Sequence, residues 1–337
     1  MNSWKHTISM HYAKAVSRGL QGDDEGLLYC LGKANISPAL MAKEDARIST
    51  EQLSRLINAQ IVYLGDEMLG LCAGQMKIGS FQLVAMHCQH ANSLRNVFMN
   101  ATRAYGLLGA EISLRVERDT ETTKIIFNSS AETTENEQFL YEFLMLVWHR
   151  FPSWLVGKTI PLMEINLPHI KPHHAAEHRL MFPSAVNYGA EECSFIIANA
   201  ELNTRVTRTA KETEQYLADV PWKWFRRLAF YSRTTQRLNM LLQAAPLSNL
   251  PSISEAATTL QTSERSLRRQ LSSEGQSFQT LKDTYLRDSA ISFLLEGQLS
   301  ISEIAYRLGY SEPAAFSRAF KKWTKSTPNA YRRQEER

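Results

Sequence analysis

Three side chains in the stretch KPHHAAEHRL, residues 171–180, have the types and the spacing of a zinc site. His174 and His178 are four residues apart, so on a helix both imidazoles lie on one face, with Glu177 beside them. In the inverted zinc peptidases an H-x-x-E-H pattern holds the metal through two imidazoles, and the carboxylate activates water. Whether this chemistry is possible depends on a third ligand and on the elements that position the motif.

The region around the motif supplies a third ligand only as a choice among Glu191, Glu192 and His169, with no spacing that favours one of them. A five-residue pattern with three fixed letters also matches often by chance. We therefore expect a packed or solvated histidine cluster, with no metal, no cofactor and no catalytic residue. A zinc-dependent hydrolase with HxxEH at 174–178, fused to a DNA-binding domain, is the alternative.

The composition of the 337 residues is that of a folded protein with two domains. Hydrophobic residues make up 44% and charged residues 21%, which excludes a disordered or fibrous chain. No C-x-x-C spacing occurs, so we expect Cys30, Cys72, Cys88 and Cys193 to be buried reduced thiols. Without a secretory signal core or an uncharged run of membrane-spanning length, the chain is expected in the cytoplasm, with no membrane partner.

Charge is distributed unevenly along the chain. Residues 1–220 carry 20 Lys and Arg against 24 Asp and Glu, net −4, whereas residues 221–337 carry 18 against 10, net +8. A basic end on a neutral-to-acidic body indicates a polyanion partner for that end, and nucleic acid is the commonest one.

The basic end contains a repeat, because SISEAATTL at Ser252 returns as SISEIAYRL at Ser300. Each copy begins with a capping box, which predicts a short helix. A break follows, at Gln261 and at Gly309, and Gly309 is the better fit to a turn with positive φ. A second helix then has one apolar and one basic face, so each copy predicts a helix-turn-helix.

A helix of about 20 residues is predicted between the two copies, from Ser277 to Gly297. Its length of about 30 Å is close to one turn of B-DNA, so it would set two recognition helices into successive major grooves. A pair of helical hairpins with solvated charges is the alternative for one copy alone. The repeated caps and basic faces argue against it for two.

These segments, LSISEIAYRLGYSEPAAFSRAFKKWTKSTPNAYRR and SERSLRRQLSSEGQSFQTLKDTYLRDSAISFLL, resemble the DNA-binding domain of the AraC/XylS family of bacterial transcription regulators. The resemblance implies that recognition helices enter the major groove. Arginine suits guanine edges, and lysine suits phosphates. Because Pro313, Ala314 and Ala315 have little to offer base edges, we expect the first helix to read more sequence. The expected DNA-binding residues are Ser263, Arg265, Ser266, Arg268, Arg269, Ala314, Ser317, Arg318, Lys321 and Lys322.

The front two thirds mix helix and strand patterns and predict an α+β domain. Residues 112–116 alternate as a half-buried strand whose hairpin partner is KIIF at 124–127, and a helix follows from Glu137 to Arg150. Further strands are predicted around 163–167 and at SFIIA, residues 194–198, with the histidine helix between them. The stretches GDEMLGLCAGQMKIGSFQLVAMHCQHANSLRNVF and EHRLMFPSAVNYGAEECSFIIANAELNTRV resemble the effector domain of the ornithine-utilisation-regulator branch, which is not a cupin barrel.

We therefore predict an α+β effector-sensing and dimerisation domain over 1–220, a linker helix over 221–232, and an all-α DNA-binding domain over 233–337 with two helix-turn-helix motifs joined by a long helix. The linker is equally well explained as a terminal helix of the front domain. The function implied is an effector-responsive activator, not an enzyme, that binds double-stranded DNA, a small molecule and RNA polymerase and forms a homodimer. A DNA-binding protein without a ligand is a third reading.

Overall fold

The computed structural model describes residues 7–43, 46–131, 133–182, 184–221, 233–273, 276–324 and 326–332. The described residues form two compact units. They are named here for the roles that the sequence predicts: the effector unit holds residues 11–35 and 51–221, and the DNA-binding unit holds residues 7–10, 36–50 and 233–332. Within these ranges no helix has the length and the apolar character needed to cross a bilayer. The four cysteines are buried free thiols, as predicted.

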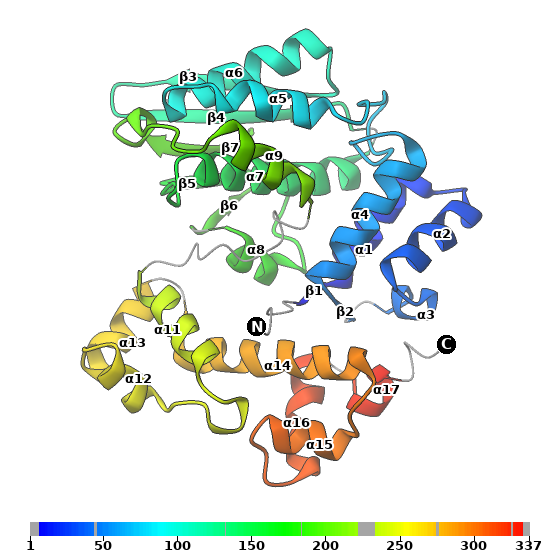
Figure 1. The fold of residues 1–337 in the computed structure, drawn as a ribbon, viewed down its shortest axis with the longest axis vertical. Helices are drawn as coiled ribbons and strands as arrows, with labels where there is room; N and C mark the ends of the chain where they lie inside the picture. Colours follow the sequence, from blue (N-terminus) through cyan, green and yellow to red (C-terminus); the bar gives the residue numbers. More distant parts are fainter. Residues whose placement is uncertain are drawn as a thin grey trace. The chain divides into compact units, whose positions relative to one another are not determined.

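The effector unit is built on a five-stranded sheet with the strand order β3-β4-β7-β5-β6 (Figure 1). The strands are β3 (Ile112–Arg118), β4 (Thr122–Ser129), β5 (Glu164–Leu167), β6 (Val186–Tyr188) and β7 (Cys193–Ala198). Neighbours are antiparallel except β5 and β6, which are parallel. The predicted hairpin is confirmed, but Met163 precedes β5 and is exposed, unlike the buried Ile165 and Leu167.

Several helices accompany this sheet, and one of them, α7, is buried along most of its length. They are α1 (Met10–Ser17), α2 (Asp24–Ala34), α4 (Thr50–Leu64), α5 (Ser80–Gln89), α6 (Leu94–Leu108), α7 (Thr134–Leu155), α8 (Ala175–Met181) and α9 (Ala210–Ala218), with short 3₁₀ turns at Arg18–Leu20 and Glu201–Asn203. The helix α7 contains the helix predicted from Glu137 to Arg150. It packs on β4 and β7, and the hydroxyl of Thr133 caps its first turn.

The DNA-binding unit contains the two predicted helix-turn-helix units. Its helices are α11 (Arg233–Ala244), α12 (Ile253–Thr259), α13 (Glu264–Ser273), α14 (Phe278–Glu296), α15 (Ile301–Arg307), α16 (Pro313–Thr324) and α17 (Pro328–Arg332), with a 3₁₀ turn at Leu247–Asn249. Both capping boxes form, Ser252 with Glu255 and Ser300 with Glu303. Of the predicted linker helix, only Pro221 lies within the described residues.

The turn inside each helix-turn-helix has the same left-handed backbone. Gln261 has φ 54° and Gly309 has φ 83°, so the poorer fit of glutamine does not change the conformation. At Gly309 a Cβ atom would also lie 2.7 Å from the carbonyl oxygen of Ser248. Glycine is therefore required at the second turn for two reasons, whereas the first turn accepts a side chain at some conformational cost.

The helix α14 is shared between two separate hydrophobic cores. Its N-terminal half, through Phe278, Leu281 and Tyr285, joins the core of α11, α12 and α13. Its C-terminal half, through Ile291 and Leu294, joins the core of α15, α16 and α17. Figure 1 shows the two sets of helices at opposite ends of α14. Its 19 residues span about 28 Å and hold both helix-turn-helix units on one rigid support.

The DNA-binding unit also includes a two-stranded ribbon that the sequence analysis placed in the front domain. Strands β1 (Thr7–Ser9) and β2 (Arg47–Ser49) pair antiparallel, and the short helix α3 (Pro38–Met41) precedes β2. The Thr7 hydroxyl donates to the buried carboxylate of Asp288 at 2.6 Å. The hydroxyl of Tyr331 accepts from the Arg47 amide at 3.2 Å and donates to the Arg47 carbonyl.

We expect the substitution Tyr331→Phe to lower the free energy of unfolding by about 1–3 kcal/mol, because it leaves the buried backbone groups of Arg47 without a partner. Tyr310→Phe is the matched control, since the half-buried hydroxyl of Tyr310 has no hydrogen-bond partner among the described residues. Urea denaturation of both variants measures the difference. Equal stability losses would show that the ribbon contributes nothing specific to the unit.

Candidate functional site

The helix α13 presents a basic face to solvent. Leu267 and Leu271 are buried in the core, whereas Arg265, Arg268 and Arg269 are exposed on the opposite side. This arrangement follows from the helical period, which separates the apolar and the basic positions onto two faces.

The polar residues of α13 divide into those with a structural role and those without one. Ser263 caps the helix by accepting a hydrogen bond from the Ser266 amide at 3.1 Å. Arg268 donates to the Glu264 carboxylate one helical turn earlier, at 2.7 and 3.0 Å. Arg265 and Arg269 have no hydrogen bond or ion pair within the described ranges. These two guanidinium groups are therefore available for a ligand without breaking a contact.

The helix α16 repeats this arrangement with fewer groups that can contact bases. Phe316 and Phe320 fill the second core, and Arg318 lies exposed between them. Ala314 is exposed and Ser317 is half-buried, while Lys321 and Lys322 are exposed in the last turn. All ten expected DNA-binding residues thus lie on or next to the outer faces of α13 and α16.

The effector unit contains an apolar cavity of about 320 Å³. It is lined by residues of α4, α5, α6, α7, α9 and the segment between α4 and α5. The rings of Phe81, Tyr105 and Trp148 form one wall, with Trp148 edge-on to both other rings at centroid distances of 6.4 and 5.7 Å. This volume and lining match the sites that bind small organic molecules.

The charged residues at this cavity are both acidic, Glu67 and Glu214. The carboxylate of Glu67 accepts hydrogen bonds from the amides of Gly79 and Phe81 at 2.7 and 2.8 Å. Burial nevertheless raises the pKa of Glu67. No basic residue belongs to the lining among the described residues, so the cavity matches a ligand with an apolar body and a cationic or hydrogen-bond-donating group.

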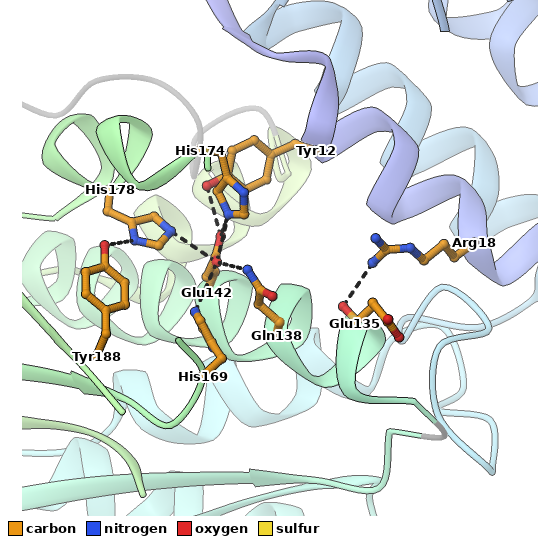
Figure 2. A network of polar contacts seen from close by, with 9 residues as sticks. All are labelled: Tyr12, Arg18, Glu135, Gln138, Glu142, His169, His174, His178 and Tyr188. Atoms are coloured by element: carbon orange, nitrogen blue, oxygen red, sulfur yellow. Dashed lines mark hydrogen bonds and ion pairs between the residues drawn. The ribbon is translucent and has the colours of Figure 1, made fainter. Parts of the chain in front are cut away.

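Apart from this cavity, the effector unit contains a polar cluster around Glu142 of α7 (Figure 2). Glu142 is 1% exposed. Its Oε1 lies 3.0 Å from Nε2 of His174, 3.1 Å from Nε2 of His178 and 3.6 Å from Nε2 of His169. Burial would raise the pKa of Glu142, but the two nearer imidazoles hold it well below its usual range. The imidazole of His11 stacks on His174, and burial lowers the pKa of His11 to about 4.

The structure thus brings His174 and His178 together, but with a carboxylate that the sequence analysis did not consider. Glu142 precedes His174 by 32 residues, and no local pattern connects them. Glu192, one of the three candidates for a third ligand, instead forms ion pairs with Lys124 at 2.6 Å and with Arg115. His169, another candidate, does lie at the cluster. The signal that the sequence offered was an acidic residue, Glu142, within the apolar stretch FLYEFLMLVW.

Sequence profiles of two families match the chain. The arabinose-binding domain of AraC transcription regulators (N-terminal) matches residues 28–206, and a helix-turn-helix domain matches residues 256–334. The first match alone covers more than half of the chain. The chain belongs to the AraC family of transcription regulators.

This AraC-family protein is similar to named transcription regulators, and the alignments cover most of both chains. The ornithine utilization regulator of Pseudomonas aeruginosa is 25% identical over 89% of this chain and 88% of its own. The regulator VirS of Mycobacterium tuberculosis is 24% identical over 90% and 89%. The solved structure of the regulator CdpR from Pseudomonas aeruginosa aligns with a TM-score of 0.34 at 18% identity, covering 96% of this chain and 98% of that one.

The family assignment identifies the protein as a DNA-binding transcription regulator and not an enzyme. The hydrolase alternative has no support among the relatives.

We expect Arg269→Ala to weaken binding to the specific operator by about 1–3 kcal/mol and to relax the preference at one or two base pairs, because Arg269 is exposed on α13 and has no ion pair with any residue that the structure describes. Arg55→Ala, an exposed arginine paired with Glu51 in the effector unit, is the matched control. Titrations on operator and random DNA measure both effects. An equal loss on the two DNAs would reassign Arg269 to a phosphate contact.

Proposed function

We propose that this regulator is an effector-responsive activator that reads two successive major grooves with α13 and α16. The observation that carries the proposal is the single helix α14, anchored in both cores, which holds two basic helices at its opposite ends. Its length of about 28 Å is close to the 34–36 Å of one DNA turn. Activation is the tendency of the family.

In this proposal Arg265, Arg268 and Arg269 contact base edges from α13, while Ser263 and Ser266 lie at the helix N-terminus, where a phosphate is favoured. The second helix uses Ala314, Ser317 and Arg318, with Lys321 and Lys322 directed to phosphates. Among the described residues, two arginines of α13 and one of α16 have no hydrogen-bond or ion-pair partner, so α13 reads more of the operator.

The effector occupies the apolar cavity beside Trp148 in this proposal. Both charged residues there are acidic, which favours a small amphipathic cation over an anion. The regulator acts in the cytoplasm, as a homodimer that contacts RNA polymerase. A dimer raises affinity for paired operator sites through the effective concentration of the second DNA-binding unit.

An operator with altered spacing tests the two-groove proposal. We expect hydroxyl-radical footprints of two protected segments about one turn apart on one face of the duplex. Because α14 fixes the separation within one chain, inserting either 5 or 10 base pairs between the segments should weaken binding. Arg269→Ala and Arg318→Ala should relax base preference in different segments. Full tolerance of the 10-base-pair insertion would mean that two separate chains read the segments.

A blocked cavity tests the effector proposal. Ala218 is exposed and lines the cavity, so Ala218→Trp places an indole at its mouth without repacking the core. In a thermal-shift screen of primary amines, amino acids and carboxylic acids, we expect cationic amphipathic compounds to raise the melting temperature of the parent and not of this variant. DNA binding without effector should be unchanged.

The matched control for this substitution is Ala200→Trp, at an exposed position outside the cavity. It should respond to the same compounds as the parent does. If compounds stabilise the parent and Ala218→Trp equally, the effector binds elsewhere.

A further inference from the structure

We propose that Glu142, His174 and His178 bind one first-row divalent transition-metal ion, for which zinc(II) is the best match. This reverses the expectation of metal-free histidines drawn from the sequence. Glu142 comes from α7, while His174 and His178 come from the start of α8, and one ligand atom of each lies within 4.8 Å of the others. Figure 2 shows both imidazoles, and that of the neighbouring His169, directed at the Glu142 carboxylate. Two imidazoles with one carboxylate are a ligand set that zinc accepts.

The distances within the cluster are those of atoms that share a metal. Zinc–nitrogen and zinc–oxygen bonds are about 2.0–2.1 Å, so the ligand atoms of a tetrahedral site lie about 3.3–3.4 Å apart. Nε2 of His174 and Nε2 of His178 lie 3.0 and 3.1 Å from Oε1 of Glu142, slightly below that value, and Nε2 of the neighbouring His169 lies 3.6 Å from the same oxygen. A shift of a few tenths of an ångström would make room for the ion.

Hydrogen bonds alone do not explain these contacts. Nε2 of His178 lies 3.1 Å from the carboxylate oxygen, but its geometry is not that of a hydrogen bond, and this nitrogen has no hydrogen-bond partner within the described ranges. A buried ring nitrogen without a hydrogen-bond partner is costly, because it has lost its hydration. Coordination to a metal gives the lone pair of this nitrogen a partner.

The buried negative charge of Glu142 also supports a bound cation. The carboxylate of Glu142 is almost fully buried, and no lysine or arginine pairs with it among the residues that the structure describes. Either a protonated imidazole or a bound cation has to balance its charge. A divalent cation does so while the imidazoles stay neutral, which is the form that binds metal.

Neighbouring residues orient the side chains of the cluster, and a cavity beside it gives an ion access. Nδ1 of His178 is 2.8 Å from the hydroxyl of Tyr188, and the hydroxyl of Tyr12 donates to Oε2 of Glu142 at 2.9 Å. Such contacts orient metal ligands in known sites. His178 and Tyr188 also line a cavity of about 380 Å³, through which an ion can reach the cluster.

The metal would act as a structural or regulatory clamp. Three protein ligands leave one position of a tetrahedral shell to water. The same helix that supplies Glu142 lines the effector cavity with the next residue, Phe143. Metal binding would therefore hold the histidine segment on α7 and stabilise one wall of the cavity.

The test uses the full-length protein, purified without a polyhistidine tag, dialysed against chelator and then metal-free buffer, and titrated with zinc chloride. We expect one zinc per chain by mass spectrometry of the eluted metal, with a dissociation constant below micromolar. Cobalt(II) in its place should give the strong visible absorption of a tetrahedral site. Zinc should also raise the melting temperature.

Substitutions locate the ion. His174→Ala and His178→Gln should each weaken zinc binding at least about 10-fold, whereas His173→Ala, an exposed histidine outside the cluster, should bind as the parent does. Circular dichroism checks that each variant is folded. The proposal is overturned if the folded parent binds zinc no more tightly than the His174→Ala variant, or if only His173→Ala loses the ion.

Discussion

Two helix-turn-helix units too small to be stable alone depend on one helix, α14, which is apolar on more than one side. Its first half completes the core around Leu267, and its second half completes the core around Phe316. Each core fixes its own recognition helix. A break in α14 would therefore destabilise both units and remove the fixed distance between them. Stability and the spacing of DNA contacts are therefore one property of this unit, set by a helix that need not touch DNA itself.

In the effector unit the buried helix α7 likewise connects two sites, as α14 connects two cores. Adjacent residues of α7 face different environments, with Glu142 among imidazoles and Phe143 beside the apolar cavity. Since Trp148, one helical turn and a half further along, forms the cavity wall with Phe81 and Tyr105, a shift of α7 along its axis would change both sites together. A packed helix moves as a body, which gives the two sites a physical means of influencing each other.

Local patterns predicted the elements that depend on local physics. Capping boxes at Ser252 and Ser300, the stop at Gly297 and the alternation in β3 are set by neighbours in sequence, and all of them form. What the sequence could not predict arises from contacts between distant segments. Tertiary packing brings Glu142 to His174 and Thr7 to Asp288. No local motif around Glu142 or Thr7 indicates which distant residue it contacts. The outward faces of α13 were predictable because the helical period fixes them once the core is known.

The ribbon of β1 and β2 has a consequence for building hybrid regulators. Exchanging DNA-binding domains between family members at one junction in 221–232 would leave this ribbon behind, since it belongs to the unit that holds α14 and α17. A buried carboxylate at 288 and a tyrosine at 331 would then meet strands from a foreign protein. A chimaera that keeps its native contacts needs four junctions, so that residues 7–10 and 36–50 travel with the recognition helices.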